Sequence, residues 1–298
     1  MQKKTITKTI TTKLDEWLKT ITDQKLQEDV KKNLIVSGGS IASMFLGEKV
    51  NDFDIFLQDV NVLKRLVEYY ATPFRVEIFD GRNKPALIKT MEDNYDEEFE
   101  KLFNARKIAI NTLKDDQIKL FLGGGGKRVN EEIKTEDLNY HPVFFSPNAI
   151  SLSNDIQIVV RFWGSPEKVH ETFDYIHATN YFTYADGVVT NLAAMESLLT
   201  RQLKYQGSHY PLTSIIRARK FIKRNWNIGA GELLKIMYQI SLLDLNDPDV
   251  LEEQLIGVDV AYFYKLITLL RGKQDTDPTF KMTYAYLCAI IDKIFGDE

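Results

Sequence analysis

The chain has 298 residues, of which 44% are hydrophobic and 27% charged, and it contains one cysteine. This is the composition of an ordinary water-soluble protein with a full core and two domains, and the single cysteine excludes a disulfide framework within the chain. The formal net charge of −4 excludes a general attraction to nucleic acid, so a polynucleotide partner would need a local basic surface.

The first part of the chain predicts helices that lead into a buried strand. The first dozen residues are rich in Lys and Thr without a hydrophobic leader, and no apolar run is as long as a membrane span, so we expect a cytoplasmic protein. Apolar residues at near-helical spacing predict one or two amphipathic helices over 14–32. The run Leu34-Ile35-Val36 then predicts a short buried strand.

Gly38, Gly39 and Ser40 follow this strand and form a candidate phosphate-binding turn. The two glycines allow the backbone to turn tightly and to approach a phosphate closely. We expect Ser40 to cap a helix over 41–46, whose first amide groups and positive dipole end would face an anion at the glycines.

Two acids, Asp52 and Asp54, come soon after this helix, in a segment over 52–57 that alternates like a strand. A spacing of two places both carboxylates on one face, where their repulsion favours a hard cation such as Mg²⁺. Paired acids beside a phosphate-binding turn predict metal-assisted phosphoryl or nucleotidyl transfer. Each feature alone is also explained by a common turn or a solvated strand edge, but their combination in one strand-turn-helix-strand unit favours the site.

Further scaffold elements follow. Residues 60–70 have a helical pattern, and 73–79 alternate as a strand that we expect beside the strand of the two acids. Segments 149–153 and 156–162 predict a hairpin with a two-residue turn, which would complete the sheet, with Gln157 or an aliphatic residue facing inward.

Between these elements, residues 80–140 differ in composition and predict an insertion. Its acidic cluster at 92–100 is expected to be a solvated helix face rather than a second metal site. Its glycines at 123–126 are expected to form a flexible turn rather than a phosphate-binding loop, because the rest of such a fingerprint is missing.

The segment before the second domain predicts a helix from Ser165 to about Asp174 and then a strand over 175–184. From Asn191 onward the pattern is helical to the end, which predicts a domain boundary near Gly187. Cys288 falls in an apolar helical run and is expected to be a small core residue.

A basic stripe marks one of these helices, over 212–226. Arg217, Lys220 and Arg224 share one side of it, where they could contact a triphosphate or an RNA backbone, or could form a solvated face. Histidines are scattered without the spacing of zinc ligands, so no zinc site is expected. His177 is interpreted as a structural residue rather than as a polar lining of the site.

The stretch from Gly38 to Asp54 resembles the Gly-Gly-x-Val-Arg-Asp, Leu-Leu-Gly and Asp-x-Asp signature of the DNA polymerase beta-like nucleotidyltransferase superfamily, in the branch of CCA-adding tRNA nucleotidyltransferases and bacterial poly(A) polymerases. The spacing agrees throughout, although Ala42-Ser43 stand where that family has Arg-Asp. Nearly the whole chain is similar to uncharacterised nucleotidyltransferase-like proteins of large tailed bacteriophages.

Later motifs resemble the same family in part. Asp174-Tyr175 align with the Asp-Phe of an Arg-Arg-Asp-Phe-Thr motif, with Glu171 and Thr172 near the positions of its arginines. The helix with the basic stripe resembles the Arg-Ala-x-Arg-Phe helix that follows the catalytic domain. The acidic and basic base-reading pair that precedes that helix in the family is not evident in 208–214, and no third acid stands on the strand of Gln157.

The resemblance implies an α/β polymerase beta-like head with a mixed sheet over 1–187, including the 80–140 insertion, and an all-helical domain over 188–298. It implies Mg²⁺-dependent transfer of a nucleotide from an NTP to a hydroxyl, with RNA or tRNA as acceptor, in the host cytoplasm if the protein is phage-encoded. Asp52 and Asp54 would hold the metal, Asp174 would support catalysis, and the nucleotide would contact Gly38, Gly39, Ser40, Arg217, Lys220 and Arg224.

Two alternatives remain open. One is a toxin-like nucleotidyltransferase that modifies a protein or a small molecule. The other is a non-catalytic phage binding or virion-associated protein that keeps the fold, which the missing Arg-Asp pair, third acid and base-reading pair favour.

Overall fold

The computed structural model describes residues 1–74, 76–93, 110, 113, 117–121, 127–128, 139–245, 247–254 and 283–295. The chain divides into two compact units: unit 1 comprises Met1–His170 and Asn180–Thr190, and unit 2 comprises Glu171–Thr179 and Asn191–Glu298. Residues 171–179, which the sequence assigned to the first domain, therefore belong to the second unit. The glycines at 123–126 and most of the acidic cluster at 92–100 lie outside the described residues.

Unit 1 is an α/β structure with a mixed sheet. Its described helices are α1 (Lys3–Leu18), α2 (Gln24–Asn33), α3 (Gly39–Leu46), α4 (Val60–Ala71), α5 (Lys84–Asp93) and α7 (Pro166–His170), with short 3₁₀ turns η1 (Thr72–Phe74) and η2 (Gly81–Asn83). Its described strands are β1 (Leu34–Ser37), β2 (Phe53–Leu57), β3 (Glu77–Asp80), β4 (Ile118–Phe121), β5 (Lys127–Arg128), β6 (Pro142–Phe145), β7 (Ala149–Leu152), β8 (Ile156–Val159), β9 (Tyr181–Thr183) and β10 (Gly187–Val189).

The main sheet has the strand order β10-β9-β1-β2-β8-β7-β6-β5. Strand β2 is antiparallel to β1 and parallel to β8, and β7 and β8 form the predicted hairpin. Strand β3 pairs with β4 in a separate small sheet, so the expectation that segment 73–79 lies beside β2 was wrong. The neighbours of β2 are instead β1, which precedes it in the same strand-turn-helix-strand unit, and β8, which comes from a distant part of the sequence.

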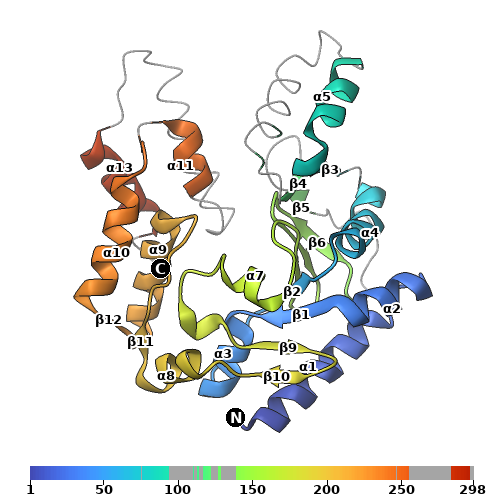
Figure 1. The fold of residues 1–298 in the computed structure, drawn as a ribbon, viewed down its shortest axis with the longest axis horizontal. Helices are drawn as coiled ribbons and strands as arrows, with labels where there is room; N and C mark the ends of the chain where they lie inside the picture. Colours follow the sequence, from blue (N-terminus) through green and yellow to red (C-terminus); the bar gives the residue numbers. More distant parts are fainter. Residues whose placement is uncertain are drawn as a thin grey trace. The chain divides into compact units, whose positions relative to one another are not determined.

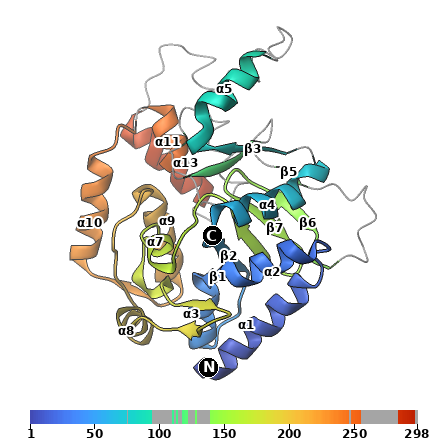
Figure 2. The ribbon, with the colours of Figure 1, turned by 45° about the vertical axis from the view of Figure 1, so that its right-hand side comes forward.

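One face of the main sheet forms the core of unit 1. Val36, Ile55 and Ile158, on three adjacent strands, are all fully buried. Helices α1, α2 and α4 contribute apolar side chains to the same core, and α2 and α4 lie side by side in both views (Figure 1 and Figure 2). The alternation of a strand then sends the neighbouring residues Ser37, Asp54 and Gln157 to the other face.

Unit 2 contains helices α8 (Leu192–Thr200), α9 (Pro211–Lys223), α10 (Ala230–Ser241), α11 (Pro248–Gln254) and α13 (Tyr284–Phe295). It also contains the 3₁₀ turn η4 (Ile176–Ala178) and a short parallel pair, β11 (Gln202–Leu203) with β12 (Asn227–Ile228). Both strands lie in the part of the chain, from Asn191 onward, that the sequence predicted to be helical, so the second unit is not all-helical. Cys288, expected in the core, is exposed.

Segment 171–179 belongs to unit 2 because of its backbone contacts. The Ile176 amide donates to the Lys204 carbonyl at 3.1 Å, and the Gln206 amide donates to the Asp174 carbonyl at 3.0 Å. These contacts replace the predicted helix and strand, so that α7 ends at His170 and only 181–183 form a strand. Among the described residues, no helix has both the length and the apolar character needed to cross a membrane.

Candidate functional site

A row of polar side chains crosses one face of the main sheet in unit 1. The pairing registers place Tyr181 of β9 opposite Ser37 of β1, Ser37 opposite Asp54 of β2, Asp54 opposite Gln157 of β8, and Gln157 opposite Ser151 of β7. Residues paired across strands project to the same face. These five residues, here called the polar row, lie on the face opposite the core.

The turn after β1 brings backbone directly against this row. Gly38 has φ +95°, a conformation that strains any residue with a side chain. A Cβ at this position would lie 3.1 Å from Oδ2 of Asp54, closer than most real Cβ contacts. Glycine is therefore needed for the backbone conformation and also for the approach to the carboxylate. The next residue, Gly39, begins α3 and has open space around its Cα.

The start of α3 has the features of an anion-binding site. Gly38 is its N-cap residue and provides no side-chain cap. The first amide groups of a helix need a partner from outside the helix, and the helix dipole favours an anion there. Ser40, expected as the cap, instead lies within α3; its Oγ is buried and has no hydrogen-bond partner among the described residues. A buried hydroxyl without a protein partner can bond to a water molecule or to a bound anion.

Asp54 is held by its neighbour in the polar row. Gln157 Nε2 donates a hydrogen bond to Asp54 Oδ1 at 3.0 Å, and Ser151 Oγ donates to Gln157 Oε1 at 3.5 Å. Asp54 itself is half-buried. The sequence left Gln157 or an aliphatic residue as the inward-facing candidate, and the contact of Gln157 with Asp54 depends on the parallel pairing of β2 with β8.

Asp52 precedes β2 and is exposed at the surface. Surrounding protein raises the pKa of its carboxyl by desolvation, and repulsion from Asp155 raises it further. Asp155 belongs to the turn of the β7–β8 hairpin, where its carbonyl accepts a hydrogen bond from the Phe53 amide at 2.8 Å. A cation would relieve this repulsion. The described residues contain no group of three side chains that could hold a metal ion, so Asp52 and Asp54 would need phosphate and water oxygens to complete a Mg²⁺ site.

His170 lies at the other end of the row, where sequence reasoning did not place it. Ser37 Oγ donates to the Asn180 carbonyl at 3.0 Å and lies 2.9 Å from His170 Nε2. A hydroxyl has one proton, so the proton in the second contact comes from Nε2. Burial lowers the pKa of His170 to about 4, which keeps the ring neutral at pH 7. The two residues are 133 positions apart, and no sequence pattern links them.

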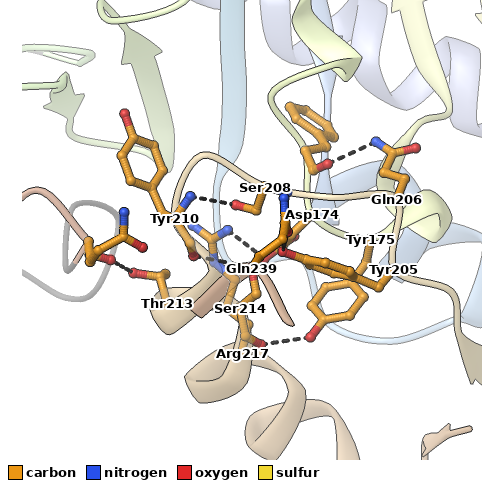
Figure 3. Close-up of polar contacts among 12 residues, drawn as sticks. Asp174, Tyr175, Tyr205, Gln206, Ser208, Tyr210, Thr213, Ser214, Arg217 and Gln239 are labelled. Carbon is orange, nitrogen blue, oxygen red and sulfur yellow. Dashed lines mark hydrogen bonds and ion pairs between the residues drawn. The ribbon is translucent and has the colours of Figure 1, made fainter. Parts of the chain in front are cut away.

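The other predicted site residues lie in unit 2. Two of them, Asp174 and Arg217, belong to a polar network around α9 (Figure 3). Arg217 donates to Asp174 at 2.9 Å, and Asp174 is only 7% exposed. Tyr175 donates to the Ser214 carbonyl at 2.7 Å beside this pair. Arg217 therefore neutralises a buried carboxylate. Lys220 and Arg224, at the end of α9, are exposed.

His177 is buried in unit 2, as its structural interpretation requires. Its ring lies 4.6 Å from the rings of both Phe221 and Trp226, and its Nδ1 has no hydrogen-bond partner among the described residues. Desolvation lowers the pKa of His177 to about 4. The predicted residues thus fall into two groups: Gly38, Gly39, Ser40, Asp52 and Asp54 in unit 1, and Asp174, Arg217, Lys220 and Arg224 in unit 2.

Comparison with known proteins gives one family match. The model of the Gabija anti-defense 2 family matches residues 8–201. Among solved structures, the chain is similar to the Thermotoga maritima CCA-adding enzyme complexed with tRNA, with 13% identity and a TM-score of 0.38 over 91% of this chain and 57% of that chain. It is also similar to the Bacillus stearothermophilus CCA-adding enzyme in complex with CTP, with 10% identity and a TM-score of 0.42 over 86% of this chain and 51% of that chain. The chain thus spans little more than half the length of these enzymes. No curated protein matches.

Proposed function

This chain belongs to the Gabija anti-defense 2 family, and we propose that its first unit is a Mg²⁺-dependent nucleotidyltransferase that moves a nucleotide from an NTP to a hydroxyl acceptor. The observation that carries the proposal is the approach of the Gly38 backbone to Asp54. A phosphate bound by the amides after Gly38 would lie beside this carboxylate. Phosphate and carboxylate oxygens are the ligands that Mg²⁺ prefers.

The residues of the site have distinct roles in this proposal. The first amides of α3 bind phosphate oxygens, and the buried Ser40 hydroxyl supplies a further donor. Asp52 and Asp54 bind Mg²⁺, which when bound would neutralise charge on the phosphates. Gln157 orients Asp54 through its 3.0 Å hydrogen bond.

We propose RNA as the acceptor, on the basis of the resemblance between 38–54 and enzymes that extend RNA. Lys220 and Arg224, which are exposed, would contact the RNA backbone, whereas Arg217 would support α9 by pairing with Asp174. We further propose that this transfer serves the role that the family name describes, counteraction of the Gabija defence.

One observation favours a second candidate, a nucleotide-binding protein without transferase activity. Gln157, a neutral residue, occupies the position next to Asp54 in the polar row and uses one of the two carboxylate oxygens. A site with fewer acids binds metal less strongly, and it could bind an NTP without activating an acceptor.

The first test compares acid-to-amide variants within and outside the site. The purified protein would be incubated with Mg²⁺, each NTP labelled at the α-phosphate, and a total RNA pool. We expect Asp52→Asn and Asp54→Asn to lower labelling of RNA by at least about 100-fold, because an amide cannot replace the charge that binds the metal. Glu28→Gln, which removes an exposed acid on α2, is the matched control and should label normally.

The location of the label distinguishes the alternatives. Label on RNA supports the proposal, and label on a protein favours the toxin-like alternative. Binding of NTP without any transfer favours the non-catalytic one. Full labelling by the Asp54→Asn variant, with an unchanged melting temperature, would refute the assignment of the site.

A further inference from the structure

Basic side chains from two elements of unit 1, η2 and α7, lie against the ring of Trp163. The Lys168 ammonium lies 4.2 Å from the centre of the ring, and the Arg82 guanidinium lies 5.6 Å from it. Cations at such distances interact with the negative face of an indole ring. The two positive charges are therefore within about 10 Å of each other, a separation at which one anionic chain can interact with both.

The Lys168 side chain is held in place by its neighbours. Gly164 has φ +127°, and a Cβ there would lie 2.7 Å from Cδ of Lys168, so the lysine stem packs against the glycine backbone. Lys168 is nevertheless exposed, and it forms no ion pair with an acid in the part of the chain that the structure describes. Glu167, the acid beside it on α7, accepts a hydrogen bond from Ser165, which lowers the pKa of the Glu167 carboxyl. A cation that is already positioned loses less conformational entropy when it binds an anion.

Asp80 neutralises only part of the charge beside Trp163. This buried acid pairs with both Lys64 and Arg82, with 3.0 Å between Asp80 Oδ2 and Arg82 Nη2. Three cations, Lys64, Arg82 and Lys168, thus accompany one acid, and these four residues are here called the basic cluster. Arg82 donates two of its side-chain N–H groups to Asp80, and a guanidinium has further donors for a second anion.

Helix α7 connects the basic cluster with the polar row. It begins at Pro166, soon after Gly164, and ends at His170, whose Nε2 lies 2.9 Å from Ser37 Oγ. Lys168 lies between these ends, about 3 Å from His170 along the helix axis. The cluster is therefore close to the proposed nucleotidyltransferase site and belongs to the same unit.

We propose that the basic cluster binds the phosphate backbone of the RNA acceptor, with Lys168 and Arg82 each in contact with a phosphate group. The inference rests on the proposed function, because it takes RNA as the acceptor. The formal net charge of the chain is −4, so its attraction to RNA must come from local surfaces such as this one. The phosphates of the bound NTP are a second source of the same chemistry, and the experiment separates the two.

The experiment measures binding of a short single-stranded RNA to the full-length protein over a series of salt concentrations. We expect Lys168→Gln and Arg82→Gln each to weaken binding roughly 3- to 10-fold at low salt. Each should also reduce the slope of log K against log salt concentration by about 0.7, the value for one phosphate contact. Lys168→Arg, which keeps the charge, should bind like the wild type. Lys31→Gln is the matched control, because Lys31 also lies over an aromatic ring, that of Tyr184, but pairs with Asp15 at 3.0 Å.

Equilibrium dialysis with Mn²⁺ and α,β-methylene ATP, an analogue that cannot transfer its nucleotide, identifies the source of the phosphate. Both glutamine variants should bind this nucleotide like the wild type. A loss of nucleotide affinity with unchanged RNA affinity would assign the cluster to the NTP and overturn the proposal.

The proposal and the proposed function can fail separately. If both variants keep the melting temperature, the RNA affinity and the salt slope of the wild type, the cluster does not bind RNA, whereas labelling of RNA by the wild type would still support the proposed function. A wild-type protein that neither labels nor binds RNA would overturn both.

Discussion

At the scale of single residues, Gly38 joins the backbone conformation to the proposed chemistry. Its positive φ and its contact with Asp54 are two independent reasons for glycine. The sequence indicated this residue and both acids because they lie in one short motif. It could not indicate His170, because the contact of His170 with Ser37 joins residues 133 positions apart. It could not indicate Ser151 either, because the place of Ser151 beside the site depends on the order of strands in the sheet.

Replacement of Gly38 by alanine tests this residue directly. We expect Gly38→Ala to destabilise the protein by roughly 1–2 kcal/mol through the strained φ, and to weaken binding of Mn²⁺ with nucleotide because Asp54 must move. Gly39→Ala is the control for stability, since an added Cβ there meets nothing within 4 Å. Denaturant unfolding and equilibrium dialysis measure the two effects. Equal stability of the two variants would contradict the assignment of strain to Gly38.

At the scale of elements, helix α9 and its C-terminal end carry basic side chains in two different environments, which the sequence grouped as one stripe. The spacing predicted that Arg217, Lys220 and Arg224 share one side of this helix, but it carried no information on their partners. Arg217 pairs with the buried Asp174, whereas Lys220 and Arg224 are exposed. The difference arises from residues 171–179, whose contacts with unit 2 overrode the strand pattern that the sequence predicted.

Substitutions on α9 should therefore separate stability from binding. We expect Arg217→Gln to cost roughly 1–3 kcal/mol in the free energy of unfolding, because it leaves a buried carboxylate unpaired while the arginine itself is partly exposed. The double variant Lys220→Gln/Arg224→Gln should change stability by less than about 0.5 kcal/mol. It should also weaken binding of a short single-stranded RNA and flatten its salt dependence. If the double variant has the same RNA affinity as the wild type across a salt series, Lys220 and Arg224 form a solvated face and do not bind RNA.

At the scale of the whole molecule, the chain passes between its two units at residues 170/171, 179/180 and 190/191. The last of these crossings lies close in sequence to Gly187, where the pattern of the sequence changes. The two earlier crossings carry no composition signal, because the segment between them is short and has an ordinary sequence. Each unit contains one histidine that burial keeps neutral, His170 in unit 1 and His177 in unit 2.

These two histidines predict how the stability of the protein depends on pH. Desolvation lowers the pKa of each to about 4, from an ordinary value of 6.5, so below pH 6.5 the unfolded chain binds protons that the folded chain does not. Stability is therefore full above pH 6.5 and falls as the pH decreases towards 4. Asp174 and Arg224 act on His177 in opposite directions, and Glu167 partly offsets the shift of His170, so desolvation determines the sign.

The measurement is denaturant unfolding between pH 7 and about pH 5, a window in which carboxylates with lowered pKa values, such as Asp15 and Asp80, stay ionised. A wholly buried histidine contributes at most about 1.4 kcal/mol per pH unit in this range. We expect His177→Gln to reduce the change in the free energy of unfolding with pH for unit 2. We expect His170→Gln to have the same effect for unit 1. Because glutamine does not titrate, each variant should lose less stability on acidification than the wild type, whatever its stability at pH 7. A wild-type protein that keeps its full stability at pH 5 would show that neither ring is held neutral by the fold.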